Sequence, residues 1–181
     1  MKTQRRLAEA LKTMMAETPL EEISVTLLSK KCGINRQTFY YHFHDVYDLL
    51  TLVFLNEKLE KVEKEINPHN LFVSLYKYYE KNSKFIDATL NPAGKDLFVE
   101  FVYNSCYTTF LKILNSYKEN KKITPNERKA IARFYGYAFA NSIVFYFTNS
   151  KNKSLEKFIQ EIQIVPENFL EFAMDKFVTN K

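Results

Sequence analysis

The sequence is poor in the residues that form tight turns, with 3 glycines and 5 prolines among 181 residues, and it has no tryptophan. All-β folds need many such turns, so an all-β fold is excluded, as are collagen-like and low-complexity chains. The two cysteines, Cys32 and Cys106, are too few and too far apart for a disulfide framework or a metal cage. We expect both to be buried thiols in a reducing compartment.

Long apolar runs are also missing. The longest charge-free window, 134–150, contains Asn141 and Ser142 and falls short of the roughly 20 apolar residues that a bilayer-spanning helix needs. Glu9 and Lys12 interrupt the apolar stretch near the N-terminus, which argues against a signal peptide. We therefore expect a cytoplasmic protein without membrane contact. The net charge of +5 allows an anionic partner without requiring one.

Apolar residues at helical spacing are present throughout the chain. Leu7, Leu11 and Met15 lie on one stripe of a first helix, with Thr3 as the expected N-cap and Thr18-Pro19 as the end. The same pattern predicts later helices over about 45–66, 70–90, 95–118 and 125–148, a short one from 154, and a last one over 166–178. We therefore predict an all-α fold.

The stretch 24–44 predicts two short helices joined by a tight turn. Ser24 is suited to cap the first helix, and Asn35 is suited to cap the second. Gly33 suits the position after the first helix, where the backbone needs a positive φ. Asp45 is a favourable start for the next helix. Two helices joined in this way form the helix-turn-helix unit that reads DNA.

The second of these helices has two different faces. Phe39 and Phe43 are one turn apart and are expected to face inward. The outer and flanking positions carry hydrogen-bonding side chains: Arg36, Gln37, Thr38, Tyr40, Tyr41 and His42. Gln and Arg can pair with base edges in the major groove, whereas Tyr and His suit phosphates. Because residues 24–44 include no acidic side chain, this surface favours DNA over the alternative, a hairpin whose charged face is only solvated.

The first fifty residues resemble the N-terminal domain of TetR/AcrR-type bacterial transcriptional regulators. The resemblance is carried by Ser24-Val25, Leu28-Ser29, Cys32-Gly33-Ile34-Asn35, Thr38-Phe39-Tyr40, His42-Phe43 and Leu49-Leu50. The string CGINRQTFYYHFHDVYDLL also resembles the subgroup of dihydroxyacetone-kinase regulators.

The resemblance implies an all-helical homodimer with a helix-turn-helix domain over 1–46 and an effector-binding and dimerisation domain over 47–181. Its implied partners are double-stranded DNA with a palindromic operator, a second copy of the chain and a small-molecule effector. Repression is the commoner action in this family. The residues implied to contact DNA are Thr26, Arg36, Gln37, Thr38, Tyr40, Tyr41 and His42.

One position departs from the family pattern. The family commonly has a phosphate-contacting lysine at the start of the fourth helix, where this chain has Val46. His44 is a candidate replacement for that contact. The departure favours an alternative function, that of a co-regulator that acts through a protein partner without binding DNA itself.

The C-terminal part is rich in aromatic residues, which are expected to form a core, a dimer seam and an effector cavity. The resemblance places the dimer interface in the windows 125–149 and 166–178. The candidates for effector binding are Phe98, Phe101, Ser105, Tyr107 and Tyr137. No catalytic motif is recognisable, and we expect no enzymatic activity, no cofactor and no metal.

Overall fold

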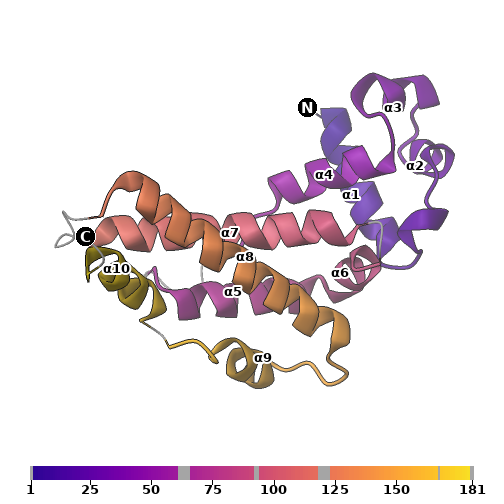
Figure 1. Cartoon of the computed structure of the whole chain (residues 1–181). Helices are drawn as coiled ribbons and strands as arrows, with labels where there is room; N and C mark the ends of the chain where they lie inside the picture. The colour runs from indigo at the N-terminus through magenta and orange to yellow at the C-terminus, as the bar shows by residue number, and fades with distance from the viewer. Residues whose placement is uncertain (1, 61–65, 92–93, 118–122, 167, 180–181) are drawn as a thin grey trace. The chain divides into compact units, whose positions relative to one another are not determined.

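The computed structural model describes residues 2–60, 66–91, 94–117, 123–166 and 168–179, and within these ranges the regular secondary structure is entirely helical (Figure 1). The predicted all-α fold is confirmed. The elements are α1 (Lys2–Met15), η1 (Leu20–Glu22), α2 (Val25–Lys31), α3 (Arg36–His42), α4 (Val46–Asn56), α5 (Pro68–Lys81), α6 (Ser83–Thr89), α7 (Lys95–Ser116), α8 (Pro125–Asn149), α9 (Leu155–Ile162) and α10 (Phe169–Thr179).

Several helices begin close to the positions that the sequence predicts, and each has a capping side chain there. The Asp45 carboxylate accepts a hydrogen bond from the Asp48 N–H at 2.8 Å and starts α4. Thr124 and Glu127 form a reciprocal capping box at the start of α8. Ser154 caps α9 in the same way as these residues, by satisfying a backbone N–H that has no partner inside the helix.

Other helix boundaries differ from the prediction. The helix α4 ends at Asn56 instead of about residue 66, and Glu57 is already extended with ψ at 142°. Residues 57–60 are not helical, and residues 61–65 of the predicted helix lie outside the described part of the chain. The predicted helix over 70–90 is broken at Asn82, a residue with poor helix propensity, into α5 and α6.

The two chain-terminal helices also differ from the prediction at their starts. Thr3 lies inside α1, which begins at Lys2, so its expected role as an N-cap was wrong. The last helix begins at Phe169 and not at Pro166, because the Phe169 N–H first bonds the Pro166 carbonyl in a turn.

The chain divides into two compact units, of which the first contains Met1–Lys58 and Lys81–Phe101. In this unit α1 packs against α2, α4 and α6 (Figure 1). The ring of Phe54 on α4 lies 5.5–5.9 Å from the rings of Phe85, Phe98 and Phe101. Helices α4 and α6 thus complete the core on which the helix-turn-helix rests. Packing does not test the expected functional boundary at residue 46, which stays a prediction.

The second unit contains Leu59–Glu80 and Val102–Lys181, and its core is largely aromatic. Here α8 packs against α9 and α10. Tyr79, Phe147 and Phe158 form a stack with ring centroids 4.1 Å and 5.3 Å apart. Cys106 is fully buried in this unit, and burial raises the pKa of its thiol. No helix in the described ranges is both long and apolar enough to cross a bilayer.

Candidate nucleic-acid interface

The turn between α2 and α3 has the geometry that the sequence predicts. Gly33 has φ +57°, in the left-handed region that favours glycine. Its N–H donates to the Lys30 carbonyl at 3.1 Å, and the Ile34 N–H donates to the Ser29 carbonyl at 3.0 Å. This pair of bonds is a Schellman motif, which satisfies the last carbonyls of α2. The chain then turns sharply into α3.

Replacing Gly33 by alanine is expected to lower the free energy of unfolding by about 1–2 kcal/mol. A Cβ atom at this position meets nothing within 4 Å, so backbone strain alone accounts for the loss. Urea denaturation of the two proteins measures the difference. Gly33→Asn is the matched control, because asparagine tolerates the left-handed region and should recover part of the stability. An alanine variant as stable as the parent would show that the turn is relaxed.

Helix α3 separates its side chains into the two predicted faces. Asn35 caps the helix by accepting a bond from the Gln37 N–H at 3.0 Å. Phe39 and Phe43 are buried, and their ring centroids are 5.6 Å apart. The predicted inward face is therefore confirmed.

The polar positions of α3 lie toward solvent to different degrees. Arg36 and Gln37 are exposed, whereas Thr38 and His42 are half-buried. Tyr41 is 83% exposed and Tyr40 is 50% exposed, which is unusual for large aromatic side chains. Thr26, on the first turn of α2, is also exposed. The predicted DNA-contacting residues are thus available to a partner, and their contact with DNA stays a prediction.

A reciprocal contact fixes α1 to the end of α2. The Arg6 guanidinium donates to the Cys32 carbonyl at 2.6 Å, and the Cys32 thiol donates to the Arg6 carbonyl at 3.7 Å. The positive charge also lies at the C-terminus of α2, where the helix dipole favours it. Sequence reasoning missed this contact because it joins residues 26 positions apart and no local pattern marks it.

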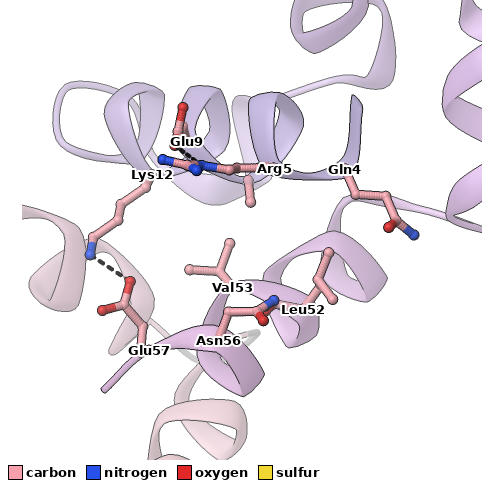
Figure 2. A pocket seen from close by; sticks show the side chains of 9 residues that line it. Gln4, Arg5, Glu9, Lys12, Leu52, Val53, Asn56 and Glu57 are labelled. Atoms are coloured by element: carbon pink, nitrogen blue, oxygen red, sulfur yellow. Dashed lines mark hydrogen bonds and ion pairs between the residues drawn. The ribbon is translucent and has the colours of Figure 1, made fainter. Parts of the chain in front are cut away.

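An ion pair joins α1 to the end of α4 (Figure 2). The Lys12 ammonium lies 2.6 Å from the Glu57 carboxylate and 5.3 Å from the centroid of the Phe85 ring. A groove of about 490 Å³ runs between the two helices, and its upper wall carries a second pair, between Arg5 and Glu9 at 2.8 Å. These contacts make the groove part of the scaffold that supports α2 and α3.

The position that departs from the family pattern lies in the core. Val46 is 8% exposed, so its side chain is not placed to contact a phosphate. His44 is exposed two residues earlier, and its backbone N–H donates to the Asp48 carboxylate at 3.1 Å. The Val46 side chain therefore contributes to core packing at the start of α4.

Four of the five candidates for effector binding are aromatic, and they fall into two clusters. Phe98 and Phe101 pack around Phe54 in the first unit. In the second unit the Tyr103 ring lies 5.8 Å from Tyr107 and 4.0 Å from Tyr137, while Ser105 is half-buried on the same helix as Tyr103. Their role in effector binding stays a prediction.

Helices α8 and α10 present an exposed aromatic surface. A hollow of about 940 Å³ lies between them. Phe134 is 69% exposed and Phe172 is 59% exposed on its walls, with Tyr137 at 51%. Large exposed apolar patches mark interaction surfaces in soluble proteins. This surface lies in the two windows in which the family resemblance places the dimer interface.

These features define a helical protein in which a capped helix-turn-helix precedes a larger helical region. Residues 66–168 match the family TetR_C_8, described as a transcriptional regulator C-terminal region. The chain therefore belongs to the TetR family of transcriptional regulators, as its N-terminal residues indicate.

Two relatives carry related names. The chain is 30% identical over 86 residues to the HTH-type dhaKLM operon transcriptional activator DhaS of Lactococcus lactis subsp. lactis (strain IL1403). That match covers 46% of each protein, so it spans about half the length of the curated relative. A solved structure described as dihydroxyacetone kinase operon activator DhaS aligns over 97% of both chains, with a TM-score of 0.64 and 23% identity.

A more distant solved structure is NalD, the secondary repressor of the MexAB-OprM multidrug efflux pump in Pseudomonas aeruginosa. It aligns over 98% of this chain and 94% of its own, with a TM-score of 0.49 and 14% identity. The likeness to the DhaS structure supports the shared fold.

Proposed function

We propose that this chain is a dimeric regulator that binds a palindromic operator and whose DNA affinity responds to a small-molecule effector. The observation that carries the proposal is the division of α3, which buries Phe39 and leaves Gln37 and Tyr41 exposed. A helix with this division packs on its own domain and enters a major groove with its other side. Its place of action is the cytoplasm, where the operator is accessible.

The proposed DNA contacts differ in what they determine. Gln37 and Arg36 have the length and the donors to pair with adenine and guanine edges, so they are assigned to sequence reading. The hydroxyl of Tyr40 and the exposed Thr26 are assigned to phosphates, which fix the register of the protein. Thr38, Tyr41 and His42 complete the surface.

The dimer is proposed to form through α8 and α10. Aromatic residues are enriched in the buried centres of protein interfaces, and the hollow between these helices exposes several of them. A two-fold axis there would present two copies of α3 to half-sites separated by about 34 Å or a multiple of it.

The effector is proposed to act by favouring one of two dimer states. A differential affinity of about 1–3 kcal/mol would change operator affinity roughly 5- to 150-fold. The sequence-based prediction of a repressor stays untested. The relative from Lactococcus lactis is named an activator, so the sign of regulation is best assigned by a reporter measurement.

A co-regulator that acts through a protein partner is the second candidate. The buried Val46 favours it, because the side chain at this position supplies no phosphate contact. Direct binding and partner-mediated action differ in one measurable property, the effect of α3 variants on DNA affinity of the isolated protein.

Gln37→Ala is expected to relax base preference at one operator position, at a cost of about 1–3 kcal/mol. Tyr40→Phe is expected to weaken binding evenly across sequences, because its hydroxyl is assigned to a phosphate. Fluorescence titration of DNA flanking the gene of this protein measures both effects. The logarithm of the affinity should fall with the logarithm of salt concentration at a slope of about −0.9 per phosphate neutralised.

Gln160→Ala serves as the matched control, since it removes an exposed glutamine from α9, far along the chain from α3. It should leave operator affinity and salt slope unchanged. If both α3 variants also bind like the parent, or if the parent retards no such fragment at low salt, the co-regulator replaces the direct-binding proposal.

A further inference from the structure

The second unit contains another cavity, and the five candidate effector residues are not among the residues that line it. It has a volume of about 440 Å³. Its walls come from the start of α5, the end of α7, the middle of α8 and the link between α9 and α10. Cavities of this size bind small organic molecules. Because segments far apart in the sequence build it, no local pattern points to it.

The walls of this cavity are aromatic. Phe72 on α5 lies 4.9 Å from Phe139 on α8, and Phe139 lies 5.0 Å from Phe169 on α10, measured between ring centroids. All three are 4–5% exposed, so the core fixes these rings in place. Preorganised aromatic faces favour a flat ring, which packs against them without a large loss of side-chain entropy.

The polar groups of the cavity are mainly neutral. The side-chain oxygen of Asn67 accepts a hydrogen bond from the Asn70 N–H at 2.8 Å. This bond orients the side-chain amide of Asn67, whose two N–H groups can donate to a ligand. Ser116 donates to the Ile113 carbonyl at 2.8 Å and keeps its acceptor capacity. Among the described residues that line the cavity, none is Lys, Arg, Asp or Glu, and the lining also includes the imidazole of His69, which is exposed.

The side chains that line the cavity favour an uncharged ligand. A charged group placed against the three buried phenylalanine rings loses part of its hydration, and the lining offers no Lys, Arg, Asp or Glu side chain to pair with it. Burial, together with the nearby Glu171 carboxylate, raises the pKa of Tyr117 at the cavity edge, so the phenol stays protonated. The same carboxylate disfavours an anion, and because Glu171 does not line the cavity, it does not offer a cation a direct partner there. An uncharged molecule avoids both costs.

We propose that this cavity binds an uncharged, ring-containing small molecule that carries a carboxamide or hydroxyl group. The proposal rests on the proposed function only in naming that molecule as the effector. The binding itself follows from the aromatic walls, the neutral polar groups and the volume.

The test uses the full chain and three probes that share the naphthalene ring system: naphthalene-carboxamide, naphthalene-carboxylate and naphthalene-methylammonium. Calorimetric titration measures the dissociation constant of each probe in the absence of DNA. We expect the carboxamide to bind about tenfold or more tightly than either charged probe. Equal or tighter binding of a charged probe, or no binding of the carboxamide, overturns the proposal.

Two adjacent residues provide a matched pair of variants. Val165 lines the cavity, whereas Ile164 is 88% exposed and does not. Val165→Trp is expected to fill the cavity and to weaken carboxamide binding about tenfold or more, whereas Ile164→Trp should bind like the parent. Asn168→Ala, a small change at an exposed lining residue, should weaken binding without affecting the fold. Circular dichroism verifies folding of each variant.

The outcomes separate this site from its alternatives. Unchanged affinity in both Val165→Trp and Asn168→Ala overturns the proposal. If Tyr107→Leu abolishes binding while Val165→Trp retains it, the ligand lies at the tyrosine cluster instead, which also overturns it. A parent chain that binds the carboxamide but no operator fragment contradicts the proposed function and leaves this site standing.

Discussion

Phe39→Ala is expected to lower the free energy of unfolding by about 3–5 kcal/mol and to abolish operator binding. Phe39 is fully buried, and its ring lies 5.6 Å from that of Phe43 and 5.7 Å from that of Tyr40. Truncation removes the apolar contacts and leaves a cavity beneath α3, which is only two turns long and depends on packing for its stability. Urea denaturation and DNA titration measure the two effects.

Tyr41→Ala is the matched control for this prediction. It removes another large aromatic side chain from the same helix, but Tyr41 is 83% exposed. We expect its unfolding free energy to stay within about 0.5 kcal/mol of the parent while DNA affinity falls. If Tyr41→Ala were as destabilising as Phe39→Ala, the exposed face of α3 would have to be packed in solution, and it would not be available to DNA.

Phe134→Asp is expected to convert the proposed dimer into a monomer and to weaken operator binding by a factor of about 100 or more. Phe134 is 69% exposed on α8 and lines the hollow between α8 and α10. A carboxylate there would be buried without a partner at the proposed interface, which is strongly unfavourable. A monomer also loses the gain in affinity from binding two half-sites together. Sedimentation equilibrium measures the oligomeric state.

Asn126→Asp supplies the control for the added charge. Asn126 is exposed in the first turn of the same helix, lies outside the hollow, and tolerates a negative charge at a helix N-terminus. This variant should stay dimeric. A dimeric Phe134→Asp protein with parental operator affinity would show that α8 and α10 do not form the interface.

The two predictions concern different requirements for DNA recognition. The Phe39→Ala variant tests whether each chain holds α3 in one orientation. The Phe134→Asp variant tests whether a second chain sets the distance between two copies of α3. A protein that depends on both should lose operator affinity in either variant, but only Phe39→Ala should lose stability. Measuring stability and affinity together therefore separates a folding defect from an assembly defect.

Local features of the sequence predicted the helix-turn-helix well. Capping by Ser24, Asn35 and Asp45 depends on side-chain bonds to backbone groups two or three residues away. The positive φ of Gly33 depends on the missing Cβ atom. The burial of Phe39 and Phe43 follows from their spacing on one helix. Each of these effects acts between residues that are a few positions apart, so it can be predicted from the sequence alone.

Contacts between distant residues were not predictable in this way. The Arg6–Cys32 contact and the Lys12–Glu57 ion pair join residues 26 and 45 positions apart. The end of α4 at Asn56 and the break at Asn82 were also missed, because helix length depends on the packing available outside the helix. Aromatic content indicated a core and a cavity, but not which rings share one cluster.

The sequence by itself determined that this chain is all-helical, where most of its helices start, and which face of residues 36–42 is polar. Helical periodicity and capping are short-range effects, and the printed residues specify them directly. Only the tertiary structure decided that Val46 is buried, that the four aromatic effector candidates fall into two clusters, and that α5, α7, α8 and the α9–α10 link line a cavity. Those outcomes depend on which distant surfaces pack together, and a one-dimensional pattern does not encode that choice locally.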